Sequence, residues 1–212
     1  MNEEFDDQKN YLEGKTEFSV ALISNCHDKS GRLNYINEMK KYISVKIFGK
    51  CGDPCPSTGV NCKEIVSKTY KFYLAFENSL CKDYITEKFF ISLRYDIIPV
   101  VLGIGEYEKY VPKSGYINVM DYKSPKELSE HLIYLSNNST AYNSYFKWKK
   151  YVKRRESKSL NVNQDICELC IKLHHDSFYG KKEYKTIDNL SNYWNHETDC
   201  KSVSEYPALT AK

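Results

Sequence analysis

Short apolar runs alternate with longer amphipathic segments along most of this chain. The runs are rich in branched and aromatic side chains and predict β-strands, at residues 18–24, 45–49, 71–76, 97–103 and 115–122. The longer segments predict helices, at residues 30–43, 86–95, 124–137 and 139–152. Strands that alternate with helices predict an α/β fold with a mostly parallel sheet and right-handed crossovers.

Local signals support several of these elements. Residues 97–103, "IIPVVLG", are almost wholly apolar, which is typical of a strand covered on both faces. Ser124 is placed to cap a helix, Pro125 takes its first position, and Glu127 is spaced to close a capping box. Residues 50–62, "KCGDPCPSTGVNC", interrupt the pattern, and we expect a covalently stapled loop there rather than a helix.

The cysteine content raises the question of compartment. The chain has eight cysteines: Cys26, Cys51, Cys55, Cys62, Cys81, Cys167, Cys170 and Cys200. One explanation is a zinc site, for which Cys51, Cys55, Cys62 and the "CELC" of residues 167–170 are candidate ligands. The other is disulfide pairing in an oxidising compartment. We favour disulfides because the spacing of Cys51 and Cys55 does not supply the second CxxC of a zinc ribbon.

Charge and hydropathy limit the function classes. A net charge of +3 is too mild to indicate a nucleic-acid partner. No window reaches the apolar length of a membrane span, and residues 1–15 are acidic and lack the apolar core of a signal peptide, so we expect no signal or anchor in this chain. The triplets beginning at Asn137, Asn138 and Asn189 match the N-glycosylation sequon, which favours the secretory pathway instead.

A polar stretch at residues 76–88, "FENSLCKDYITEK", carries the main candidate chemistry. It follows the strand of residues 71–76, so it lies at the carboxyl edge of the sheet, where ligands of parallel sheets bind. We expect the Thr86 hydroxyl to cap the next helix, which places Glu87 and Lys88 in its first turn. A lysine at a helix start is a candidate phosphate contact, with a solvated surface lysine as the alternative.

A second polar spot is predicted at the same edge. Ser24 and Asn25 follow the first strand, and Arg32 opens the next helix. Arginine binds phosphate bidentately, so Arg32 and Lys88 together predict a pyrophosphate clamp. The alternative for Arg32 is an ordinary surface arginine in the first turn of a helix, without a ligand. The chain has no GxGxxG or Walker A motif, so ordinary dinucleotide and ATP sites are unsupported.

Other polar residues of the stretch are ambiguous on chemistry alone. Asn78 is either a turn residue or a donor and acceptor to a ligand, and Tyr84 either stacks on a base or ribose or packs. Glu77 and Glu87 are either ordinary strand-end and first-turn residues or acceptors from sugar hydroxyls.

Longer motifs identify a family. The sequence "YKFYLAFENSLCKDYITEKFF", followed by "IPVVLG", "YINVMDYKSPKELSEHLIYLSNN" and "YNSYFKWK", resembles the donor-binding half of the α-1,3-fucosyltransferases. The resemblance extends upstream through "ALISNC" and "GRLNYINEMKKYI" and downstream to "CELC", covering roughly residues 18–200. The "GKCG" insertion, "SLCKDY" and Cys200 resemble invertebrate core-type members more than the vertebrate Lewis-type ones.

The resemblance implies a GT-B glycosyltransferase of two Rossmann-like domains, in which the C-terminal domain holds GDP-fucose and transfer inverts fucose C1. Matched by motif, the residues with catalytic roles at the diphosphate and fucose are Arg32, Lys88 and Glu87. The matched donor-binding residues are Ser24, Asn25, Asn78 and Tyr84. The resemblance implies no metal site and no obligatory cofactor, with a divalent cation at most stimulatory.

The resemblance also implies a domain organisation. We predict an N-terminal segment at residues 1–17, a Rossmann-like GDP-fucose-binding domain at 18–156 and a cysteine-containing C-terminal tail at 157–212. The family is anchored in the Golgi membrane and transfers fucose to GlcNAc of a glycoprotein N-glycan, of core or Lewis type. Its acceptor site and general base lie in an N-terminal domain that we expect to be absent here.

Two consequences are expected from that absence. This chain alone would then show negligible transfer, and the alternative is a non-catalytic nucleotide-sugar-binding remnant or regulatory module. In related enzymes the CxxC bonds to cysteines of the N-terminal domain, so Cys167 and Cys170 are expected to be free or paired with each other.

Overall fold

The computed structural model describes residues 6–56, 61–151, 162–179 and 199–210. Contacts divide the chain into a main unit, residues 1–151 with 196–212, and a second unit, residues 152–195. The second unit is described by α6 (Val162–Tyr179). All candidate site residues at strand ends fall in the main unit.

The main unit is built on a five-stranded parallel sheet in the order β2-β1-β3-β5-β6. Its strands are β1 (Glu17–Leu22), β2 (Val45–Phe48), β3 (Tyr70–Phe76), β5 (Ile98–Leu102) and β6 (Ile117–Asn118). Two further short strands, β4 (Leu80–Cys81) and β7 (Cys200–Lys201), form an antiparallel pair. The predicted α/β fold with a mostly parallel sheet is confirmed.

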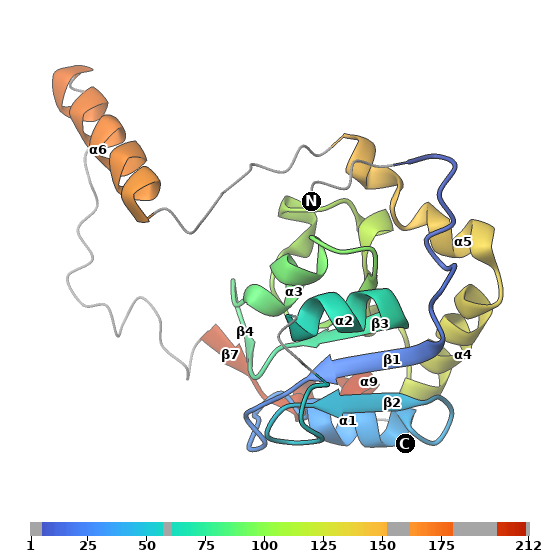
Figure 1. The fold of residues 1–212 in the computed structure, drawn as a ribbon. Helices are drawn as coiled ribbons and strands as arrows, with labels where there is room; N and C mark the ends of the chain where they lie inside the picture. Colours follow the sequence, from blue (N-terminus) through green and yellow to red (C-terminus); the bar gives the residue numbers. More distant parts are fainter. Residues whose placement is uncertain (1–5, 57–60, 152–161, 180–198, 211–212) are drawn as a thin grey trace. The chain divides into compact units, whose positions relative to one another are not determined.

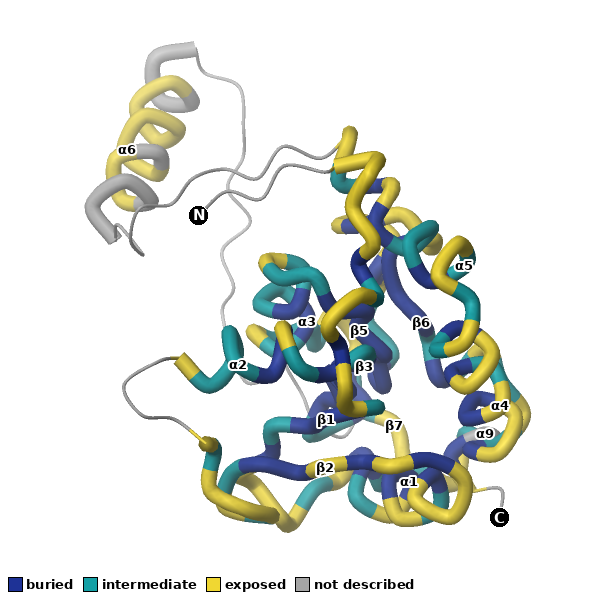
Figure 2. Tube along the Cα trace, turned by 45° about the vertical axis from the view of Figure 1, so that its right-hand side comes forward, coloured by how far each residue is buried: buried dark blue, intermediate teal, exposed yellow. Residues whose placement is uncertain are grey.

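Helices cover both faces of the sheet (Figure 1). Buried side chains of one face belong to a cluster with helices α1 (Arg32–Met39), α4 (Pro125–Ser136), α5 (Ser139–Ser144) and α9 (Pro207–Thr210). Those of the other face cluster with α2 (Cys62–Thr69) and α3 (Glu87–Ser92). The central strands are accordingly buried along most of their length, which explains their continuous apolar sequences (Figure 2).

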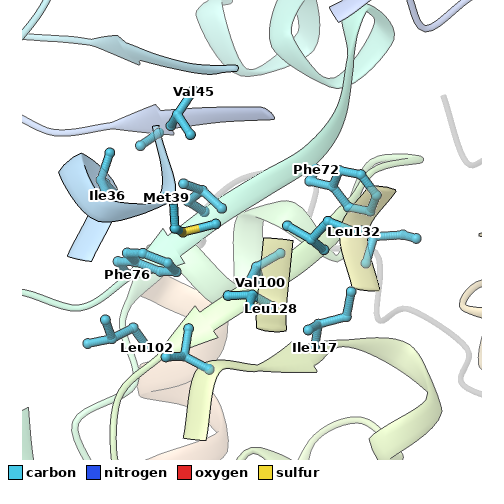
Figure 3. Close-up of a cluster of buried hydrophobic side chains, with 14 of the residues drawn as sticks. Ile36, Met39, Val45, Phe72, Phe76, Val100, Leu102, Ile117, Leu128 and Leu132 are labelled. Carbon is cyan, nitrogen blue, oxygen red and sulfur yellow. The ribbon is translucent and has the colours of Figure 1, made fainter. Parts of the chain in front are cut away.

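Strand β3 shows how the two clusters share one sheet. Phe72, Leu74 and Phe76 belong to the first cluster, whereas Tyr73 and Ala75 belong to the second. This alternation follows from the two-residue period of a strand. Figure 3 shows Phe72 and Phe76 among the buried side chains of α1, α4 and β5.

Two segments differ from the sequence prediction. Residues 62–69 form the helix α2, which the sequence pattern did not predict. The helix begins there because the side chain of Asn61 caps it, accepting from the Lys63 N–H at 3.1 Å. The strand predicted at 115–122 ends at Asn118, whose side-chain oxygen accepts from the Met120 N–H and turns the chain into a 3₁₀ helix.

The helices predicted near the end of the main unit form with altered detail. Ser124 caps α4 as predicted, accepting from the Glu127 N–H at 3.2 Å, but the Glu127 carboxylate accepts from the Lys123 N–H at 2.7 Å and not from Ser124. The helix predicted at 139–152 is α5 followed by a 3₁₀ helix, Lys147–Lys150.

Three disulfides tie the main unit together: Cys26–Cys51, Cys55–Cys62 and Cys81–Cys200. They confirm disulfide pairing over the zinc alternative for these six cysteines. Gly49 immediately precedes the stapled loop, and its φ of +110° and close approach to the Ile23 carbonyl require glycine, since a Cβ would lie 2.5 Å from that oxygen. Cys167 and Cys170 lie exposed on α6 without a disulfide.

The sequons lie at the junction of two helices. Asn137 follows α4, and its side-chain amide donates to the Ile133 carbonyl at 3.0 Å. Asn138 caps α5 by accepting from the Ala141 N–H, also at 3.0 Å. Asn189 lies outside the described residues, and glycosylation at the three sites stays a prediction.

Among the helices that the structure describes, none combines the length and apolarity needed to cross a membrane.

Candidate functional site

The strand order creates a switch point between β1 and β3. The chain passes from β1 to β2 on one side and then returns to place β3 on the other side of β1. In open parallel sheets, ligands bind beyond the carboxyl ends of the strands at such a point. Ser24 and Asn25 follow β1 there, and Glu77 and Asn78 follow β3.

Arg32 joins the two strand ends. Its Nη1 donates to the Phe76 carbonyl at 3.0 Å, and its Nη2 donates to the Asn25 carbonyl at 2.9 Å and to Asn78 Oδ1 at 3.1 Å. The residue is only 2% exposed, although it stands first in α1. Its guanidinium is therefore a structural bridge across the switch point as well as a buried positive charge.

The electrostatic surroundings of Arg32 suit a buried cation. Burial lowers the pKa of the guanidinium, while Asp28 and Glu77 act in the opposite direction. Its Nε is buried and has no hydrogen-bond partner among the described residues. That Arg32 touches a phosphate directly stays a prediction, since both of its terminal nitrogens already bond within the protein.

The loop after β1 is held against the end of β3. The Asn78 carbonyl accepts from the backbone N–H groups of Lys29 and Ser30 at 3.0 and 3.1 Å. Asp28 Oδ1 accepts from the Arg32 N–H at 2.9 Å. These bonds fix Asn25 and Asn78 on either side of Arg32 and leave the Asn25 side chain at the exposed edge.

A second cluster surrounds the fully buried carboxylate of Glu77. Its Oε1 accepts from the Thr86 N–H at 2.8 Å and the Thr86 hydroxyl lies 2.8 Å from its Oε2. The Lys88 Nζ lies 2.9 Å from the Thr86 hydroxyl and 3.4 Å from Glu77 Oε2. The prediction that the Thr86 hydroxyl caps α3 is wrong, because this hydroxyl bonds to Glu77 and no side-chain cap forms.

Lys88 is the cation of this cluster that reaches the surface. Its side chain is 18% exposed. The Lys88 Nζ also pairs with Oε1 of Glu87 at 3.2 Å, and the Glu87 side chain is 63% exposed. Partial burial raises the pKa of Glu87, but Lys88 together with hydrogen bonds to the backbone and to Thr86 outweighs burial, so the net shift is downward and Glu87 is ionised at neutral pH. Since α3 has only six residues, its dipole adds little and Lys88 carries the local positive charge.

The remaining predicted residues lie around these clusters. Tyr84 is half-buried and follows Asp83, which takes a left-handed conformation at φ 57°. Ser24 and Asn25 are exposed at the end of β1. The structure thus gathers two groups at adjacent strand ends, Arg32 with Asn25 and Asn78, and Lys88 with Glu87 and the buried Glu77. Their contacts with a ligand stay predictions.

The residue that sequence reasoning undervalued is Glu77. Its sequence chemistry fits either an ordinary strand-end residue or an acceptor from sugar hydroxyls, yet Glu77 is 0% exposed and organises the polar stretch. A charged residue directly after five consecutive apolar or aromatic positions is the signal that could have found it, because a carboxylate so close to the core needs partners.

Comparisons with known proteins identify the family of this chain. Residues 12–193 match the family model described as "Glycosyltransferase family 10 (fucosyltransferase) C-term". Glycoprotein 3-alpha-L-fucosyltransferase A of Drosophila melanogaster is 42% identical over 200 residues, which cover 92% of this chain and 38% of that protein. Alpha-(1,3)-fucosyltransferase C of the same species is 32% identical over 182 residues, or 85% of this chain and 41% of that protein.

A solved structure shares the fold. The crystal structure of an alpha1,3-fucosyltransferase with GDP-fucose aligns at a TM-score of 0.58 and 24% identity, covering 70% of this chain and 43% of that one. The chain thus spans less than half the length of the proteins to which it is compared. The family model and the Drosophila relatives establish that this chain belongs to glycosyltransferase family 10, the fucosyltransferases.

Proposed function

We propose that this chain is the donor-binding part of an α-1,3-fucosyltransferase and holds GDP-fucose at the carboxyl ends of β1 and β3. The observation that carries the proposal is the pair of cationic side chains, Arg32 and Lys88, at this switch point in a member of the fucosyltransferase family. A diphosphate is an anion that two such cationic side chains are suited to bind.

The proposed roles follow from exposure and charge. Lys88 contacts the diphosphate, because its ammonium lies at the surface of the cluster. Arg32 contributes its buried charge and fixes Asn25 and Asn78, whose side chains bind polar groups of the nucleotide sugar. Tyr84 lies against the nucleotide, and Glu87 accepts from sugar hydroxyls. Ser24, exposed at the end of β1, is the remaining donor-binding residue of the proposed site.

In the proposed reaction, an acceptor hydroxyl of GlcNAc on a glycoprotein glycan attacks fucose C1 with inversion and gives its proton to a general base, which the family resemblance places in the N-terminal domain. The bond from C1 to the diphosphate oxygen breaks, and GDP leaves with the bonding electrons. Lys88 and Arg32 then stabilise the negative charge that develops on the diphosphate, an effect typically worth about 3 kcal/mol for one well-placed donor. The glycoprotein acceptor is proposed from the name of the Drosophila relative.

Cofactor use and location complete the proposal. We expect binding and transfer to need no obligatory metal, because Lys88 and Arg32 can balance the diphosphate charge. The three disulfides favour an oxidising compartment, and we propose the Golgi lumen.

Calorimetry with the 212-residue chain tests this proposal. In buffer with EDTA, we expect GDP-fucose and GDP to bind with one site each, and UDP-N-acetylglucosamine not to bind at the same concentration. Binding of the two guanine nucleotides that disappears in EDTA would contradict the metal-free proposal. Absence of GDP-fucose binding in either buffer would overturn the donor-site assignment.

A further inference from the structure

The carboxylate of Glu77 is placed where a charge is costly. The side chain is 0% exposed, and the backbone is fixed on both sides, since the Glu77 N–H donates to the Leu102 carbonyl at 2.9 Å and its carbonyl accepts from the Ser30 hydroxyl at 2.6 Å. A buried carboxylate is tolerated only where donors and a cation surround it. Among the described residues, each of its side-chain hydrogen bonds leads to Thr86 or Lys88.

These bonds form one chain of contacts from the core to the surface. The Thr86 N–H and hydroxyl both donate to Glu77, and the hydroxyl oxygen accepts from Lys88 Nζ. The same Nζ lies within salt-bridge distance of Glu77. A lysine has four rotatable side-chain bonds, so a single outer partner such as the exposed Glu87 would not fix its ammonium.

We propose that Glu77 is a positioning residue of the donor site, holding the Lys88 ammonium, directly and through Thr86, in the place where it meets the diphosphate. The inference rests on the proposed function and adds a buried residue to it. Glu77 itself touches no ligand in this arrangement and acts through Lys88.

The sign of the expected effect separates positioning from simple electrostatics. Glu77 is a negative charge close to where an anionic ligand binds, so its neutralisation alone would strengthen GDP binding. A positioning role predicts the opposite. The Glu77→Gln substitution removes the negative charge that retains Lys88. We expect the Kd for GDP to rise about tenfold, which is the effect of losing one charge-assisted hydrogen bond.

The test is a double-mutant cycle read by GDP calorimetry on the full chain. We expect Glu77→Gln to weaken binding in the wild-type background and to change nothing further in a Lys88→Ala background, because the two residues act as one unit. Thr86→Val provides a second variant that removes only the linking hydroxyl, and weaker binding is expected again. Glu64→Gln, an exposed carboxylate in the first turn of α2, is the matched control that leaves the Kd unchanged.

Each outcome has a distinct meaning. If wild type binds GDP and Glu77→Gln and Thr86→Val bind equally well or more tightly, the positioning role is wrong while the donor site stands. Additive losses from Glu77→Gln and Lys88→Ala would also contradict it, since they indicate a structural effect independent of Lys88. Failure of wild type to bind GDP sinks the proposed function itself.

Discussion

Replacing Arg32 by methionine is expected to lower the free energy of unfolding by about 4 kcal/mol, because it removes a buried cation together with three hydrogen bonds. Methionine has a similar length and no donors, so the Phe76 carbonyl, the Asn25 carbonyl and Asn78 Oδ1 all lose this partner at the junction of β1 and β3. The change is measured by urea unfolding, followed by the fluorescence of the buried Trp148.

Two further variants sharpen this prediction. Arg32→Lys keeps the charge but not the planar fork, so we expect a loss of about 2 kcal/mol. Lys126→Met removes an exposed lysine whose nearest carboxylate, Glu130, is 4.0 Å away, and should leave the midpoint nearly unchanged. If Arg32→Met unfolds at the same urea concentration as Lys126→Met, the bridge that we describe does not stabilise the fold.

Removing the disulfide between Cys81 and Cys200 is expected to cost about 5 kcal/mol. The bond closes a loop with a sequence separation of 119 residues, and the entropy that a cross-link removes from the unfolded chain grows with loop length. It also anchors β7 beside β4, within the polar stretch, and the same C-terminal segment places Leu209 in the core. Loss of the bond therefore releases a segment that the main unit uses.

The chain supplies its own control for this prediction. The Cys55–Cys62 bond has a sequence separation of only 7, for which the same relation gives about 2.5 kcal/mol. We therefore compare Cys81→Ala/Cys200→Ala with Cys55→Ala/Cys62→Ala by urea unfolding, after alkylation of the exposed Cys167 and Cys170. Equal losses, or a larger loss from the short loop, would contradict the account of the long-range bond.

The sequence predicts well those features that depend on short windows. Apolar runs identify the five strands of the sheet, and the predicted strand–helix alternation matches the observed parallel topology. Because strand carboxyl ends meet at one edge, the sequence also predicts that residues after the strands at 18–24 and 71–76 are neighbours, as Asn25 and Asn78 are through Arg32.

What the sequence does not predict depends on tertiary contacts. Arg32 opens a helix, a position that favours a surface side chain, and only the fold shows it buried between two strand ends. Thr86 has the local chemistry of an N-cap, but the carboxylate of Glu77 competes successfully for its hydroxyl. Disulfide partners such as Cys81 and Cys200 are too distant in sequence for any local rule to pair them.

The most direct measurement of the central claim is the affinity of GDP for Lys88→Ala relative to wild type. Lys88 is the cation of the proposed site that reaches the surface, so its loss should raise the Kd about 30-fold, as expected for one charge-assisted contact to phosphate. Lys126→Ala should leave the Kd unchanged. Equal affinity of Lys88→Ala and wild type for GDP would contradict a donor site at the carboxyl ends of β1 and β3.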